Sequence, residues 1–145
     1  MRPGEIERTI VQAVRSRPGA TAILVVLDAD DDCPVDVAAD LMARAGGETE
    51  LPVRVVVPKV EIEAWVLASI ESVRGVRGIC EDAAVPLDPE AIRDAKGALS
   101  RLMDGARGYV ATDDLPAFFA AIDLDEAATR SPSFAKFRRD IASAV

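Results

Sequence analysis

The feature that most constrains the fold is a pair of short aliphatic runs separated by one helix-like segment. Residues 22–27 are aliphatic without interruption, and residues 51–57 form a second run rich in β-branched side chains. Each run is too short for a typical helix and fits a strand that is buried on both faces. The segment between them opens at Pro34 and ends at Gly46 and Gly47, which are common helix boundaries. The pattern predicts a βαβ unit with two parallel strands.

Helical patterns surround this unit. Apolar residues spaced four apart predict a helix over residues 4–16, ahead of the first strand. After the second strand, helical spacing or helix-start signals predict further helices from Glu61, over residues 88–103, from Asp114 or Leu115, from Asp123 with Glu126 as a capping box, and from Ser131 with Pro132.

A chain of 145 residues is expected to form one domain. We expect an α/β part over residues 1–72 and a helical part over residues 88–145, joined by a loop rich in turn signals. No apolar run approaches the roughly 20 residues that span a bilayer, and the first residues lack the apolar region of a secretory signal. We therefore expect a cytoplasmic protein without membrane contact.

Charge and residue types narrow the chemistry. The net charge of −8, from 25 acids and 17 bases, argues against broad electrostatic binding to nucleic acid. It leaves room for a nuclease-type site, because bound metal ions supply positive charge. The chain has no histidine, which excludes Ser-His-Asp and Cys-His catalysis and any imidazole-ligated metal. A metal would be held by oxygen atoms, which favours Mg²⁺ or Mn²⁺, with Ca²⁺ as an alternative.

Acidic residues follow both predicted strands. Asp28 and Asp30 come directly after the first strand, and Lys59, Glu61 and Glu63 come after the second. Because parallel strands end at the same edge of a sheet, where α/β proteins bind ligands, these groups are expected to meet there. Crowded carboxylates repel one another, and a cation relieves that repulsion. The sequence thus predicts a divalent-metal site at this edge.

The same acids also have structural interpretations. Asp31 and Asp32 are expected to cap the following helix and to interact favourably with its dipole, with Cys33 as an alternative residue at the N-cap. Glu61 and Glu63 fit the first turn of a helix equally well, and a small acidic domain whose acids only cap helices remains an alternative. Haloacid-dehalogenase-type phosphatases also begin with Asp-x-Asp after a strand, but they prefer a small or β-branched residue where Asp32 stands.

Several segments together resemble a known bacterial family. They are Asp28-Ala29-Asp30-Asp31-Asp32-Cys33-Pro34, Glu61-Ile62-Glu63-Ala64-Trp65, Pro89-Glu90-Ala91-Ile92-Arg93-Asp94-Ala95-Lys96-Gly97, the residues Tyr109, Thr112, Asp114 and Pro116, and Ser131-Pro132-Ser133-Phe134. This pattern resembles domain of unknown function 4276, which is similar to Toprim domains of topoisomerases, primases and nucleases. The resemblance implies a partial Toprim-like (Rossmann-like) parallel sheet followed by a helical C-terminal half.

The resemblance also implies roles for particular residues. Asp28 and Asp30 would hold Mg²⁺ or Mn²⁺, and Glu61 or Glu63 would supply the further acid. Beyond the resemblance, we expect Lys59 to contact a phosphate of nucleic acid. The general acid/base glutamate that usually lies on an earlier strand has no counterpart in this sequence, so we expect nuclease activity to be weak or absent. The alternative is a non-catalytic module that binds a partner, for example an ATPase of a bacterial defence system. An exposed sheet edge also suggests a homodimer.

Overall fold

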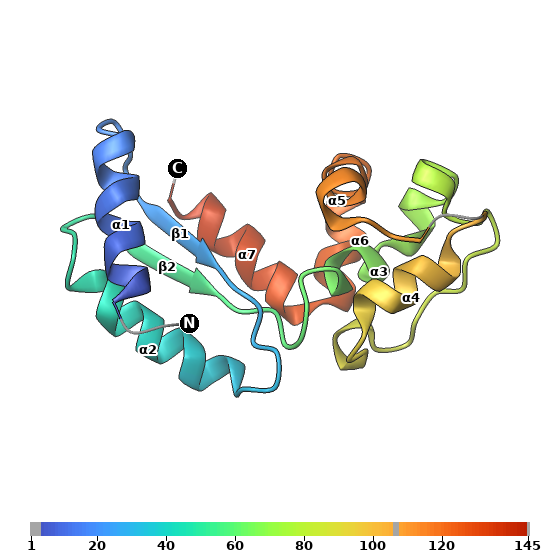
Figure 1. The fold of residues 1–145 in the computed structure, drawn as a ribbon, viewed down its shortest axis with the longest axis horizontal. Coiled ribbons are helices and arrows are strands. Elements are labelled where there is room, and N and C mark those ends of the chain that lie inside the picture. The colour runs from blue at the N-terminus through green and yellow to red at the C-terminus, as the bar shows by residue number, and fades with distance from the viewer. Residues whose placement is uncertain (1–3, 106–107, 145) are drawn as a thin grey trace.

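A two-stranded parallel sheet forms the centre of the N-terminal half of the molecule (Figure 1). The computed structural model describes residues 4–105 and 108–144. Strand β1 (Ile23–Val26) pairs in parallel with β2 (Val53–Val56), with Ile23 opposite Val53 and Val26 opposite Val56. Helix α2 (Pro34–Gly46) connects the two strands. The predicted βαβ unit is confirmed.

One face of this sheet is covered by α2 and by α1 (Glu5–Ser16), the predicted N-terminal helix. Odd-numbered strand residues face these helices: Val55 is 1% exposed and packs in one cluster with Ile6, Ile10 and Leu41, each at most 2% exposed. Side chains alternate between the two faces of a strand. The apolar spacing of α1 therefore serves to bury that helix against the sheet.

The opposite face of the sheet is covered by the last helix, α7 (Pro132–Ala142), whose ribbon lies on the side of the strands away from α1 in Figure 1. Even-numbered strand residues point this way, and Val56 packs with Trp65 and Phe134. The ammonium of Lys136 donates a hydrogen bond of 2.7 Å to the carbonyl of Val55. Helix α7 thus packs the C-terminal end of the chain against the sheet, and its Lys136 provides a hydrogen-bond donor for the carbonyl of Val55 in β2.

The C-terminal half is built from short helices around a fully buried one, α3 (Ala64–Ala68), every residue of which is buried. The remaining elements are η1 (Ile70–Val73), η2 (Val76–Gly78), η3 (Pro89–Ala91), α4 (Ala95–Leu102), α5 (Ala111–Phe119) and α6 (Leu124–Arg130). Val66 and Leu67 of α3 contact Leu99 of α4 and Phe118 of α5 in one core. Within residues 4–105 and 108–144, no helix combines the length and the apolar character required to cross a bilayer.

Two of the expected helix starts in the C-terminal half have side-chain caps in the structure. The Asp123 carboxylate accepts hydrogen bonds from the backbone N–H groups of Asp125 and Glu126 and so caps α6. The Ser131 hydroxyl accepts one from the N–H of Phe134 and caps α7. Such caps satisfy N–H groups that have no partner within the helix. The predicted starts at Asp123 and Ser131 are confirmed.

Several expected helix boundaries were wrong, including the start at Asp114 or Leu115, since α5 begins at Ala111. The helix predicted over residues 88–103 is two elements, because Asp88 caps η3 at Ala91 and Asp94 starts a new helix by accepting from the N–H of Gly97. Neither Asp31 nor Asp32 caps α2. Cys33, the expected alternative, takes the N-cap position there without a side-chain capping bond, and the preceding aspartates lie in the exposed loop.

An ion pair joins α1 to α2. The guanidinium of Arg44 donates to both carboxylate oxygens of Glu7, at 2.8 and 3.1 Å. This hydrogen bonding from Arg44 lowers the pKa of Glu7 below its ordinary 4.5. The pair is a surface one, and such pairs contribute little.

We expect Arg44→Met to lower the urea midpoint at pH 7 by much less than Leu41→Ala, whose buried side chain should cost roughly 2–5 kcal/mol. Since the folded pKa of Glu7 is depressed, the stabilisation by the pair is present above the unfolded pKa and is lost as the pH falls through the folded value. The difference between wild type and Arg44→Met should therefore shrink in acid. A constant difference between pH 7 and the acid limb would contradict this assignment.

Candidate functional site

The loops that follow β1 and β2 run side by side beyond the sheet. The N–H of Ala29 donates to the carbonyl of Pro58 at 3.1 Å, and the N–H of Asp30 donates to the carbonyl of Val60 at 3.3 Å. The Asp28 carboxylate reaches across and accepts a hydrogen bond of 2.8 Å from the N–H of Ile62. Ile62 is the residue between Glu61 and Glu63, so this hydrogen bond holds the Asp28 carboxylate next to the segment that carries both glutamates. We call Asp28, Glu61 and Glu63 the acidic cluster.

Glu63 is the most buried member of the acidic cluster, with 1% of its surface exposed. One carboxylate oxygen, Oε1, accepts a hydrogen bond of 3.0 Å from the hydroxyl of Tyr109. The other, Oε2, is buried and has no hydrogen-bond partner among the described residues. It lies 3.8 Å from the Nζ of Lys96. A buried carboxylate oxygen without a donor is costly, because water no longer solvates it.

Lys96, in the first turn of α4, is the cation that contacts the cluster. Its Nζ donates to Glu61 Oε1 at 2.9 Å, and its backbone N–H donates to Glu61 Oε2 at 3.1 Å. The hydrogen bond with Glu61 raises the pKa of Lys96, and the charges of Glu63, Glu61 and Asp28 raise it further. One ammonium group therefore interacts with all three carboxylates.

The electrostatics of the site show a surplus of negative charge. Burial raises the pKa of Asp28; the hydrogen bond from Ile62 opposes this effect, and the neighbouring charge of Glu63 adds to it. Burial also raises the pKa of Tyr109, and the charge of Glu63 adds to the rise. Each effect disfavours a further negative charge at these positions. The cluster would be stabilised by more positive charge than Lys96 alone provides.

The other residues predicted for the site lie at its exposed side. Asp30 is exposed and adopts a left-handed backbone conformation with φ 52°, which aspartate tolerates better than most residues. Its charge raises the pKa of Asp28 less than the burial of that carboxyl and the charge of Glu63 do. Asp31 forms an exposed ion pair with Arg93. Lys59 is exposed, and within the described part of the chain no ion pair joins it to Glu61 or Glu63.

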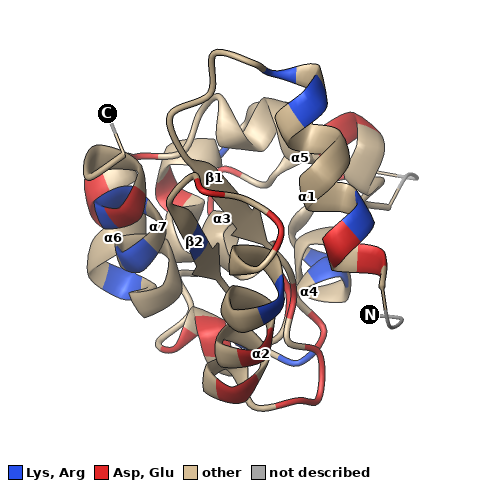
Figure 2. Cartoon of the chain, turned by 90° about the vertical axis from the view of Figure 1, so that its left-hand side faces the viewer, with Lys and Arg blue, Asp and Glu red and all other residues tan. Residues whose placement is uncertain are grey.

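An acidic groove of about 590 Å³ adjoins the cluster. Its acids come from the loop after β1, from α2 and from the first residue of α1; red acidic segments are visible in Figure 2. The acidic residues that line it are Glu5, Asp28, Asp30, Asp32, Asp36 and Asp40. Arg44 is the basic residue in its wall. Asp28 therefore belongs both to the buried acidic cluster and to a negatively charged surface.

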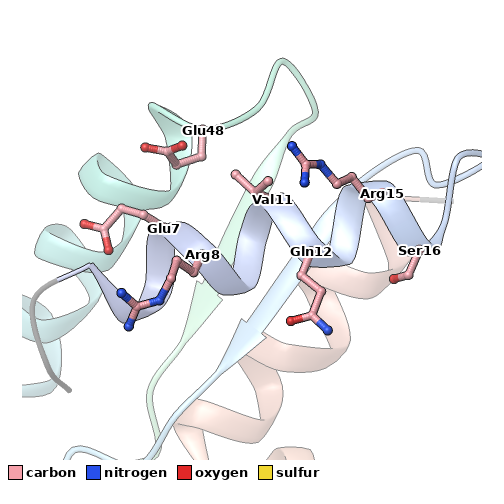
Figure 3. Close-up of a pocket in the computed structure, with 7 residues that line it drawn as sticks. All are labelled: Glu7, Arg8, Val11, Gln12, Arg15, Ser16 and Glu48. Carbon is pink, nitrogen blue, oxygen red and sulfur yellow. The ribbon is translucent and has the colours of Figure 1, made fainter.

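A second groove, of about 550 Å³, lies along the outer side of α1 (Figure 3). Its lining residues are Glu7, Arg8, Val11, Gln12, Arg15, Ser16 and Glu48. Both charge signs occur in it, and it shares no residue with the acidic cluster. The groove on α1 is therefore not part of the candidate site.

The donor chemistry of the cluster fits a hard divalent cation. All three acidic side chains offer oxygen, and Glu63 Oε2 is a buried acceptor without a donor. Over residues 4–105 and 108–144, no three Cys, Asp or Glu side chains are arranged closely enough to form a ready-made metal site. The ammonium of Lys96 lies among these carboxylates instead.

Sequence reasoning assigned no role to two residues of the site, Lys96 and Tyr109. Both fall within the segments that carry the family resemblance, but neither is near a strand end in the sequence. Lys96 is separated from Glu61 by 35 positions, and Tyr109 from Glu63 by 46. Periodicity and capping motifs involve residues close together in the sequence, so they do not predict contacts between residues so far apart along the chain.

A further buried carboxylate, Glu90, has a structural role. It is 9% exposed and accepts hydrogen bonds from the Ser131 hydroxyl and from the N–H and hydroxyl of Ser133, the latter two at 3.0 and 2.6 Å. The indole N–H of Trp65 donates to the Ser133 hydroxyl oxygen at 2.7 Å. The network joins η3, α3 and the first turn of α7. All three of these hydrogen bonds are accepted by one oxygen of Glu90, Oε1, whereas Glu63 Oε1 accepts one.

Comparisons with known proteins identify a family but no activity. Neither the curated proteins nor the solved structures contain a match to this chain. A family model described as a domain of unknown function (DUF4276) matches residues 4–142. This match covers nearly all of the 145 residues, including both strands, the acidic cluster and Lys96. The chain belongs to the DUF4276 family, a domain of unknown function.

Proposed function

We propose that the acidic cluster binds Mg²⁺ or Mn²⁺ and that the protein is a Toprim-like domain acting on phosphodiester bonds of nucleic acid. The observation that carries the proposal is Glu63. Its carboxylate is 1% exposed, and its Oε2 has no hydrogen bond within the described residues, although Asp28 and Glu61 lie beside it. A protein keeps such a group buried at a cost, and a bound cation would compensate for that cost.

The residues around the cluster hold it in a form suited to a cation. The N–H of Ile62 orients Asp28, and the hydroxyl of Tyr109 orients Glu63. Asp28, Glu61 and Glu63 would hold the ion, with Asp30 at the exposed side. Oxygen donors select Mg²⁺ or Mn²⁺ over softer metals. A bound ion of this kind neutralises charge on a phosphoryl group.

The position of the site supports the nucleic-acid assignment. Both acidic segments leave the carboxyl ends of parallel strands, where α/β folds bind ligands, and Asp28 with Asp30 matches the Asp-x-Asp of Toprim domains. Lys59 is exposed near this edge and remains our candidate for a phosphate contact.

Since no strand precedes β1 within residues 4–105 and 108–144, the acid/base glutamate of an earlier strand is not part of this proposal. We expect cleavage to be slow, because acid–base catalysis typically contributes about 10²–10⁴-fold.

Calorimetric titration with MnCl₂ and MgCl₂ tests the proposal. We expect wild type to bind at least one ion and Asp28→Asn to bind roughly tenfold or more weakly, because charge count sets the affinity of oxygen-ligand sites. Asparagine keeps an oxygen that can accept from the N–H of Ile62, so the local fold should persist. Asp82→Asn, at an exposed loop position, is the matched control and should bind like wild type. Negligible heat from wild type with both ions would contradict the proposal.

The acidic groove favours a second candidate function, a non-catalytic module that docks a partner, for example an ATPase. Its row of aspartates would attract a basic segment of such a partner. Incubation of wild type with DNA and RNA in Mn²⁺ separates the two candidates. Cleavage that Asp28→Asn abolishes would exclude the purely non-catalytic module, whereas metal binding without any cleavage would favour it.

A further inference from the structure

Lys96 brings a positive charge from the helical half of the chain into the acidic cluster. Its Nζ lies 2.9 Å from Glu61 Oε1 and 3.8 Å from Glu63 Oε2, and its charge also acts on Asp28. These are the same carboxylates that we expect to hold a divalent cation. A lysine ammonium and a metal ion cannot both approach them this closely without strong repulsion.

The geometry allows the ammonium of Lys96 to leave while the acids stay. The Lys96 side chain is 46% exposed, whereas that of Glu63 is 2% exposed. A lysine side chain is a flexible four-carbon stem with a compact charge at its end. The helix carrying it is held independently, because Ala95 and Leu99 of α4 are fully buried and the backbone N–H of Lys96 is bonded to Glu61. Movement of Nζ therefore requires only side-chain rotation.

The charge balance of the acidic cluster favours replacement of the Lys96 ammonium by a divalent cation. Asp28, Glu61 and Glu63 carry three negative charges when ionised, and Lys96 supplies one positive charge. A divalent ion compensates more of this charge and brings directed bonds to the buried Oε2 of Glu63, which has no donor in the described residues. In the metal-free protein, Lys96 partly compensates the negative charge of the acidic cluster.

We propose that Lys96 is a tethered counter-ion that competes with the divalent cation for Glu61 and Glu63, so that cation binding releases its ammonium toward solvent at the mouth of the site. This inference rests on the proposed function and adds how the site is controlled. It makes Lys96 a determinant of metal affinity, and it leaves a free positive charge beside the loaded cluster, where an anionic phosphate would approach.

Calorimetric titration of Lys96→Met with MnCl₂ tests the exchange. Methionine has a similar unbranched shape but no charge, so we expect Mn²⁺ to bind about tenfold or more tightly than in wild type, because a competing positive charge is gone. The matched control is Arg101→Met. It removes one positive charge from the same helix, where Arg101 is 67% exposed and pairs with Asp94 at 3.4 Å, and it should bind like wild type.

A second measurement uses the unmodified protein, so it does not depend on the folding of a variant. The chain has three lysines, Lys59, Lys96 and Lys136. Partial acetylation followed by mass spectrometry reports the accessibility of each ammonium. Saturating Mn²⁺ should increase the modification of Lys96 about tenfold if its ion pair opens. Lys59 is exposed and Lys136 is bonded to Asp140 and Val55 away from the cluster, so neither should change.

The outcomes separate the inference from the function on which it rests. If Lys96→Met binds Mn²⁺ no more tightly than wild type, and Mn²⁺ leaves Lys96 acetylation unchanged while Asp28→Asn still weakens binding, the exchange is wrong and the metal site stands. If wild type and Lys96→Met both fail to bind Mn²⁺, the proposed function fails together with the inference.

Discussion

Replacement of Glu90 by alanine is expected to lower the free energy of unfolding by roughly 3–5 kcal/mol, the range for breaking a buried charged network. The Glu90 carboxylate is 9% exposed and accepts three hydrogen bonds, from the Ser131 hydroxyl and from the N–H and hydroxyl of Ser133. Alanine leaves these donors without their acceptor at a largely buried position. It also removes the tie between η3 and the start of α7, the helix that covers the sheet.

Urea unfolding followed by tryptophan fluorescence measures this loss. Trp65 is the chain's only tryptophan, and its indole N–H donates to the Ser133 hydroxyl oxygen, so its emission reports directly on the network. Glu90→Gln keeps one acceptor oxygen and should lose less stability than Glu90→Ala. Glu50→Ala changes an exposed glutamate and should stay within about 0.5 kcal/mol of wild type. A loss below about 1 kcal/mol for Glu90→Ala would show that this network does not hold α7 in place.

Replacement of Glu63 by glutamine is expected to weaken Mn²⁺ binding by on the order of a hundredfold, because loss of a proposed ligand should cost at least as much as the upper end of the roughly 10–100-fold range for residues that only support a ligand. Glutamine preserves the size of the side chain and an oxygen that can accept from the Tyr109 hydroxyl. It removes the negative charge and puts either an amide oxygen or an amide NH₂ where Oε2 lies 3.8 Å from the Nζ of Lys96. The site loses charge at its most buried position, where solvent screens least.

Thermal unfolding of Glu63→Gln accompanies the titration and shows whether the fold is retained. We expect the midpoint without metal to stay close to that of wild type, because the variant loses an ion pair but also a buried charge. Glu71→Gln is the matched control. Glu71 lies on η1 outside the acidic cluster, its side chain is 52% exposed, and it forms an ion pair with Arg74. Equal Mn²⁺ affinity for Glu63→Gln and Glu71→Gln would remove Glu63 from the metal site and with it the main support for the proposed function.

The two buried glutamates, Glu63 and Glu90, differ in how many hydrogen bonds they accept. Glu90 accepts three hydrogen bonds at Oε1 and so joins η3 to the start of α7 and, through Ser133, to Trp65 of α3. Glu63 has Tyr109 at one oxygen and no hydrogen bond at the other within the described residues. Both were part of one family resemblance, so their presence in the sequence did not distinguish their roles. The number of donors around each carboxylate does.

The sequence by itself determined the βαβ unit, the exclusion of imidazole chemistry, and the starts of α6 and α7. These features depend on interactions within a few residues of one another: an aliphatic run, a missing residue type, or a cap such as Asp123 bonding Asp125 and Glu126. Parallel strands then follow from the length of the connection, because a crossover helix must return the chain to the same edge. The expected meeting of acids after the two strands was a consequence of that topology.

Only the tertiary structure decided which groups face one another. The continuous helix predicted over residues 88–103 breaks before α4, since Asp94 provides a second start, and the break presents Lys96 to Glu61 across 35 positions of sequence. Tyr109 reaches Glu63 in the same way, because α4 and α5 pack against α3 in one core. Periodicity and caps act locally along the chain, whereas a contact between distant side chains depends on how whole helices pack. The acidic run could therefore be read from the sequence, but the lysine that neutralises part of its charge could not.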